Sequence, residues 1–270
     1  MNHSQGMTVI GSYNFGLVAL SIIIAAISSS VALTLASRLR SATKQERFRW
    51  TLGGACAMGF GIWAMHFTGM LAYDLGMLVR YDLPTVLVSL IAAIGAAAVA
   101  LNVIYREGIT WLRLILGGTL MGAGIGVMHY TGMYAMRMEA HTAYNPRIFL
   151  LSVAVAVVVA TMALWFASQT MKDDVTSGSD LFTAAILMGL GVASMHYTAM
   201  IAASFEVQST MVGSTAFALD LSRLWVGVII FATLLILGFG LRRSGVGRVS
   251  SVPWLSPPSQ AETDRRADIP

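Results

Sequence analysis

Long apolar runs alternate with short polar segments along this chain of 270 residues. A helix needs roughly 20 apolar residues to cross the hydrocarbon core of a bilayer. Seven runs approach or exceed that length, and none of them contains Asp, Glu, Lys or Arg. The runs are 13–37, 50–73, 83–105, 114–136, 148–171, 181–205 and 224–241. The pattern predicts an all-α membrane protein with seven transmembrane helices.

Composition agrees with this fold class, since 56% of the residues are hydrophobic, 11% are charged and the mean hydropathy is +0.72. The predicted organisation is an outer N-terminal segment at 1–12, a seven-span domain at 13–241 and a cytoplasmic tail at 242–270. The tail is rich in Ser, Pro and charge, which predicts disorder. We expect the first run to be a retained span rather than a cleaved signal peptide, because no basic residue precedes it.

The distribution of Lys and Arg predicts the orientation of these spans. Alternate connections carry very different numbers of basic residues, thirteen on one side, including the tail, and four on the other. Positive residues favour the cytoplasmic side of a membrane. We therefore place the N-terminus outside and the C-terminus inside. Because the basic residues flank apolar runs, the net charge of +4 is explained by topology, and no nucleic-acid partner is expected.

A motif of the form M-G-x-G-x-x-x-M-H-[FY]-T-[GA]-M occurs three times, in the second, fourth and sixth runs. Its copies begin at Met58, Met121 and Met188. A thirteen-residue pattern repeated at near-constant separation indicates internal triplication. We predict three two-helix repeats, each a motif helix followed by a plain helix, with the first span as an extra helix outside the triplication.

Besides lacking Asp, Glu, Lys and Arg, the seven runs contain only three histidines, which are His66, His129 and His196. An ionisable side chain within a membrane is costly and marks a functional site by default. Each lies roughly 10 to 14 Å below the outer end of its run, at 1.5 Å per residue. Neighbouring glycines allow close helix packing. The sequence therefore predicts that the three histidines meet at one depth.

Methionines accompany each histidine at fixed offsets. A residue four positions after the histidine shares its helix face, whereas the preceding residue points about 100° away. The predicted metal ligands are the three histidines with these methionines: Met70, Met133, Met200, Met65, Met128 and Met195. Imidazole combined with thioether favours copper, especially Cu(I). The sequence leaves the number of ions open, as well as the alternative that the histidines are neutral and hydrogen-bond across helices.

The three motifs resemble those of the MHYT domain, a family of bacterial integral membrane sensors with six or seven spans. The resemblance implies a bacterial inner-membrane location, motifs near the outer face, bound copper and a diatomic gas ligand such as O2, CO or NO. This sequence differs from the family pattern at Phe67, which replaces the motif tyrosine, and at Ala199, which replaces glycine. Many members carry cytoplasmic domains that make or degrade cyclic di-GMP. None is visible here, so we expect a stand-alone form or a fragment that signals through a partner.

The preferred functional hypothesis is a metal-binding membrane sensor, in contact with lipid and with a signalling partner, and not an enzyme. A second hypothesis is a membrane oxidoreductase or assembly factor with haem held by two of the histidines. A third is a copper transporter, although the inner halves of the runs offer few polar ligands. No arrangement typical of hydrolytic catalysis is visible.

Overall fold

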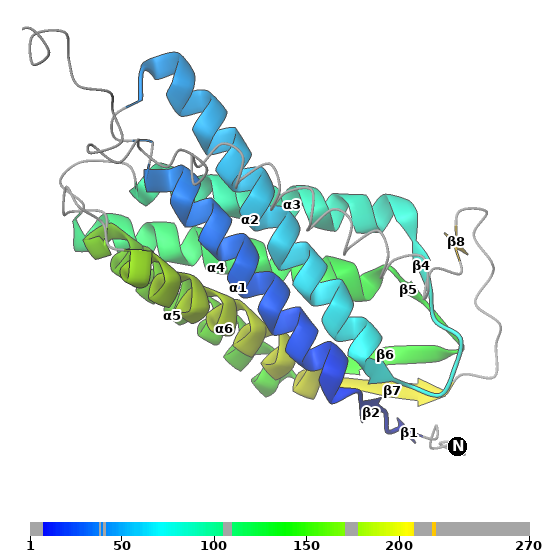
Figure 1. Cartoon of the computed structure of the whole chain (residues 1–270). Coiled ribbons are helices and arrows are strands. Elements are labelled where there is room, and N and C mark those ends of the chain that lie inside the picture. Colours follow the sequence, from blue (N-terminus) through cyan, green and yellow to red (C-terminus); the bar gives the residue numbers. More distant parts are fainter. Residues whose placement is uncertain are drawn as a thin grey trace, which may run out of the picture.

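Six long helices make up the bundle in the computed structural model, which describes residues 8–37, 39, 42–104, 110–170, 178–207 and 218–219 (Figure 1). The helices are α1 (Phe15–Ser37), α2 (Lys44–Ala72), α3 (Leu83–Ile104), α4 (Trp111–Tyr134), α5 (Pro146–Thr170) and α6 (Gly178–Ala202). Each is long and apolar enough to cross a membrane. They correspond to the first six predicted spans. The predicted seventh span, 224–241, and the tail, 242–270, lie outside the described residues.

The helices form a closed ring in which each packs against its two neighbours in sequence and α1 also packs against α6. The motif helices α2, α4 and α6 lie towards the inside, and α2 is the most enclosed of the six. The other three turn large apolar side chains outwards, among them Ile91 of α3 and Leu150 of α5. This distribution suits a bundle whose outer surface faces lipid.

Glycines of the motif fix how closely the helices approach. In each motif the first glycine lies against the backbone of the helix that follows in the ring. A Cβ on Gly59 would lie 2.5 Å from the Cα of Ile94 in α3, and one on Gly122 would lie 2.6 Å from the Cα of Val157 in α5. Gly189 closes the ring, because its Cβ would lie 2.6 Å from the nitrogen of Ala26 in α1. Helix α1 thus occupies, beside α6, the same place that α3 and α5 occupy beside α2 and α4.

The three helices without the motif, α1, α3 and α5, are here called the outward helices, and they also begin in the same way. Asn14, Asp82 and Asn145 accept hydrogen bonds through their side chains from backbone N–H groups two or three residues further on. Their own N–H groups donate to carbonyls at the ends of α2, α4 and α6, respectively. The described ring therefore contains three units of a plain helix followed by a motif helix. The first span was predicted as an extra helix, whereas in this ring α1 is equivalent to α3 and α5.

Short β-strands cover the end of the bundle where the motif helices finish (Figure 1), here called the strand end. The strands are β1 (Thr8–Val9), β2 (Ser12–Tyr13), β3 (Tyr73–Asp74), β4 (Arg80–Asp82), β5 (Met136–Arg137), β6 (Ala140–Tyr144), β7 (Ala203–Val207) and β8 (Ala218–Leu219). They pair antiparallel in the orders β1-β7-β6, β2-β3 and β5-β4-β8. The strictly all-α prediction missed them, since such short polar stretches lack a strand pattern.

Helix packing at the motif glycines generates the first prediction. In Gly122→Ala the added methyl group meets the α5 backbone, which cannot rotate away as a side chain can. Overpacking of this kind typically costs about 1 to 3 kcal/mol of stability. Thermal unfolding of the purified protein in detergent should show a lower midpoint.

Gly126→Ala is the matched control, because it lies one turn further along α4 and its added Cβ would meet no atom within 4 Å. This variant should be as stable as the unmodified chain or up to about 1 kcal/mol more stable, since alanine favours the helix. Equal midpoints for the two variants would contradict the proposed role of Gly122.

Candidate metal centre

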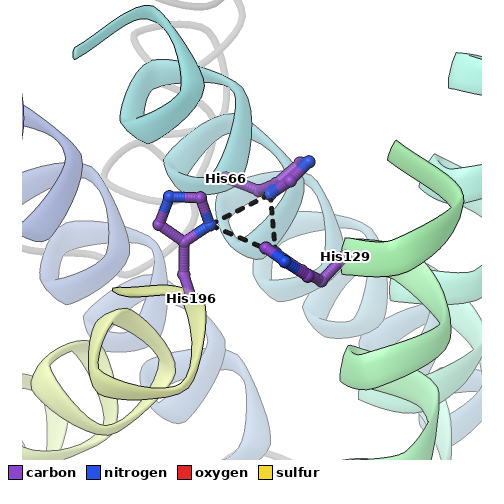
Figure 2. A group of neighbouring side chains, drawn as sticks. All are labelled: His66, His129 and His196. Carbon is purple, nitrogen blue, oxygen red and sulfur yellow. Dashed lines mark hydrogen bonds between the residues drawn. The ribbon is translucent and has the colours of Figure 1, made fainter. Parts of the chain in front are cut away.

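The three motif histidines converge in the interior of the bundle, as the sequence predicts (Figure 2). His66 comes from α2, His129 from α4 and His196 from α6, and all three side chains are completely buried. Each lies five or six residues before the last residue of its helix, about 8 to 9 Å below the strand end. Their equal depth follows from the equal position of the motif in each repeat.

The Nδ1 atoms of the three rings form a nearly equilateral triangle, with sides of 3.1 Å (His66 to His129), 3.1 Å (His66 to His196) and 3.2 Å (His129 to His196). The centre of the triangle lies about 1.8 Å from each atom, and points about 0.9 to 1.1 Å above or below its plane lie about 2.0 to 2.1 Å from each, the length of zinc–imidazole bonds. The spacing of the three nitrogens is therefore compatible with one first-row metal ion.

Hydrogen bonding alone cannot explain this triangle. The Nδ1 of a neutral imidazole is either a donor or an acceptor, never both. Among three such atoms at least two must have the same role, so at least one of the three contacts joins two lone pairs or two N–H groups. A cation at the centre would use all three lone pairs at once. The donor set therefore fits a metal ion better than it fits an unassisted hydrogen-bonded cluster.

The outer sides of the rings are enclosed by the backbone of the neighbouring motif helix. The Nε2 atoms of all three histidines are buried and have no hydrogen-bond partner among the described residues. A Cβ on Gly69 would collide with Nε2 of His196, and one on Gly132 would collide with Nε2 of His66. The motif glycine thus makes room for a ring from another repeat, a role that sequence reasoning missed. Ala199 holds this motif position in the third repeat.

The aromatic residue of each motif packs edge-on against the histidine that precedes it, and the two motif tyrosines also contact the next outward helix. The hydroxyl of Tyr130 lies 2.6 Å from Oγ of Ser152 in α5, and that of Tyr197 lies 2.8 Å from Oγ of Ser21 in α1. In the first repeat Phe67 has no hydroxyl, and the corresponding Ser89 of α3 donates to the carbonyl of Val86. These tyrosines therefore tie the centre to the outward helices.

A second triplicated pattern, Y-[ND]-x6-S, carries these serines and could have been found in the sequence. It begins at Tyr13, Tyr81 and Tyr144, and it places a capping residue and then the serine at the same offsets each time. The three tyrosines pack edge-on against motif aromatics, for example Tyr81 against Phe67 with ring centroids 5.5 Å apart. The pattern is shorter and less distinctive than the histidine motif.

All six predicted methionine ligands are buried, with exposed fractions of 5% or less. They do not all line one space. Met70 lines a pocket at the strand end, whereas Met195 lines a smaller cavity deeper in the bundle. Their role as metal ligands stays a prediction.

The pocket at the strand end has a volume of about 530 Å³ and reaches Met70, one helical turn beyond His66. Tyr13, Asp74, Met77 and Tyr81 also line it. Burial raises the pKa of the Tyr13 phenol to about 12 and raises that of Tyr81 as well, so both phenols are neutral near pH 7. Asp74 contributes the acidic side chain of the pocket lining. Its lining thus combines soft sulfur, neutral phenols and one carboxylate.

Comparison with known families identifies the motif. The family profile described as MHYT, a bacterial signalling protein N-terminal repeat, matches residues 5–47, 59–117, 122–173 and 189–250. The second and third matches each begin in a motif helix and continue through the outward helix that follows it, as the predicted repeats do, and the first match includes α1. No solved structure matches this chain.

Three curated bacterial signalling proteins are similar to the chain. It is 42% identical over 233 residues to the bifunctional diguanylate cyclase/cyclic di-GMP phosphodiesterase MucR of Pseudomonas aeruginosa, which covers 86% of this chain and 34% of MucR. It is 33% identical over 205 residues to the signaling protein YkoW of Bacillus subtilis, covering 75% of this chain and 26% of YkoW. It is 34% identical over 197 residues to the cyclic di-GMP phosphodiesterase NbdA of P. aeruginosa, covering 73% and 25%. The chain spans about a third or less of these relatives.

The tie between Tyr130 and Ser152 generates the second prediction. Tyr130→Phe should lower the free energy of unfolding by about 0.5 to 1.5 kcal/mol, the usual net value of one hydrogen bond. Adding Ser152→Ala should cost less than Ser152→Ala costs alone, because the two changes share this hydrogen bond, while Ser152 also donates to the carbonyl of Phe149. Thermal unfolding of both single variants and the double variant measures the coupling; strictly additive effects would contradict the bond.

Proposed function

The chain belongs to the MHYT family, and from that premise we propose that it is an integral membrane sensor that binds copper through His66, His129 and His196 and responds to a diatomic gas. The observation that carries the proposal is the Nδ1 triangle with sides of 3.1 to 3.2 Å. Three protein ligands leave a coordination position free for a small ligand, as three-ligand zinc sites do for water.

Copper is favoured over other first-row metals by the surroundings of the triangle. Imidazole accepts zinc, copper, iron and nickel, whereas thioethers select Cu(I). Methionines precede each histidine and follow it by four residues, and all are buried in the same core. The strand-end pocket is also lined by methionines, which are Met70, Met77 and Met136.

The same geometry argues against the haem alternative. Two axial histidines must stand on opposite faces of a porphyrin, which requires a flat space between their nitrogens much wider than one ion. Here each pair of Nδ1 atoms is separated by 3.2 Å or less, with a third ring beside it. The copper-transporter alternative lacks a described polar path from the triangle towards the end of the bundle opposite the strands.

We place the strand end outside the bacterial inner membrane. The opposite end carries Lys44, Arg47 and Arg49 at the start of α2, and positive residues favour the cytoplasm. A gas or a metal ion would then arrive through the strand-end pocket, which reaches Met70, one helical turn beyond His66. The signal would leave at the cytoplasmic end, by way of a partner protein or of domains like those that MucR and NbdA carry.

Metal analysis tests this function. Purified protein loaded with copper and then desalted should contain at least one copper ion per chain, one of which is held at the histidine centre. His66→Ala, His129→Ala and His196→Ala should each lose most of that ion, because removal of one of three ligands leaves a weak two-ligand site. Mass spectrometry of the metal content is the measurement.

His141→Ala is the control, since His141 is exposed on β6 and lies opposite Glu206 in the strand pairing. It should keep the full copper content. If all three buried-histidine variants also keep it, the proposed copper site is wrong.

Glycine substitutions test how the rings are positioned. Gly132→Ala places a methyl group against His66 and should weaken copper binding about 10- to 100-fold, the typical effect of disturbing a residue that supports a metal ligand. Ala199→Gly makes the opposite change in the third repeat and should leave the affinity within a few-fold of the unmodified chain. Competition titration with a Cu(I) chelator would measure both; an unchanged affinity in Gly132→Ala would count against the role of the glycine.

A further inference from the structure

A small internal cavity lies deeper in the bundle than the histidine triangle. Met58, Met121 and Met188 line it together with Met195. The first three hold the same place in the three motifs, eight residues before the histidine. Eight residues of helix correspond to about 12 Å along the axis. One methionine from each repeat therefore reaches a common space well below the imidazoles.

The space is narrow and apolar. Its volume is about 10 Å³, which is room for about one water-sized sphere. The rest of the lining consists of alanine, valine, isoleucine and glycine, chiefly from α5 and α6. The exposed fractions of the three motif methionines are 1 to 4%. A water molecule would find no oxygen or nitrogen side-chain partner among these residues, whereas a soft ion would find several thioethers.

We propose that this cavity is a second metal site, built from thioethers alone, that takes a soft monovalent cation of the Cu(I) and Ag(I) class. Thioethers select such ions. Because thioethers are neutral and nothing charged lines the cavity, a divalent ion would keep its full charge in an apolar interior, which is much more costly than one positive charge. The limited volume excludes a hydrated ion. The proposal does not depend on the copper site at the histidines.

Core packing is the competing explanation, since methionine commonly fills gaps between apolar side chains. It accounts for one such residue readily. It does not explain why this position is methionine in all three repeats while the neighbouring outward-facing positions differ. It also does not explain why a space remains open between such flexible side chains. Substitution by leucine separates the two explanations, because leucine fills a similar volume but has no sulfur that could bind a metal ion.

The experiment uses the full chain in detergent with Ag(I) alone as the probe. In a His66→Ala/His129→Ala/His196→Ala background, we expect one tightly held silver ion per protein with only sulfur neighbours in its X-ray absorption spectrum. Adding Met58→Leu, Met121→Leu and Met188→Leu should remove that ion or weaken its binding at least tenfold. Met-to-Leu exchanges nearly conserve volume, so the fold should persist. Met138→Leu with Met162→Leu is the control and should leave the ion in place.

Several results would overturn the proposal. They are the absence of bound silver in the histidine-free background, a spectrum without sulfur neighbours, or equal silver binding by the triple-leucine and control variants. If the combined variants fail to fold, Met58→Leu alone in the otherwise unmodified chain must weaken the binding of one silver ion several-fold, and an unchanged titration would refute the site. A chain that binds silver at the methionines but no copper at the histidines would contradict the proposed function while leaving this second site intact.

Discussion

The close approach of α2, α4 and α6 is the constraint on which the rest of the structure depends. Three imidazoles can meet nitrogen to nitrogen only if the helices that carry them come close together, and glycines permit this at two levels. Gly59, Gly122 and Gly189 let the outward helices press against the motif helices. Gly69 and Gly132 leave room for the rings themselves. The histidine centre is therefore a product of backbone contact between helices.

Much of this arrangement could be predicted from the sequence. Six of the seven predicted spans are helices in the described residues, and the convergence of His66, His129 and His196 is confirmed. Both predictions come from strong signals: hydropathy identifies spans because a bilayer demands long apolar helices, and a triplicated motif at equal depth constrains where its residues can lie.

The features that were missed depend on weaker signals. The equivalence of α1 with α3 and α5 was not predicted, because only the histidine motif was used to define the repeat, whereas Asn14, Asp82 and Asn145 begin the three outward helices in the same way. The strands at the end of the bundle are two to five residues long and pair across segments far apart in sequence. These strands pair because the helices bring the segments that connect them close together, and no local sequence pattern predicts that arrangement.

Departures from threefold symmetry give the three histidines different environments. Gly69 and Gly132 back His196 and His66, but the third motif has Ala199 at this position. The motif aromatics Tyr130 and Tyr197 are bonded to serines of α5 and α1, whereas Phe67 offers Ser89 no hydroxyl. The helix that carries His66 therefore lacks the tyrosine–serine bond that the motif residues of α4 and α6 form. The three histidines are equivalent in position but not in the way their helices are held.

A change in the size of the triangle would not stay local. Each motif helix packs against two outward helices, and closely packed interiors transmit displacement instead of absorbing it. Closely packed interfaces of this kind tend to shift between discrete arrangements. Helix α2 carries the effect furthest, because it runs from His66 near the strand end to Lys44 at the opposite end, where its first turn is fixed by a capping box between Thr43 and Glu46. Any movement of His66 along the helix axis would therefore reach, through one continuous and most enclosed helix, its charged first turn.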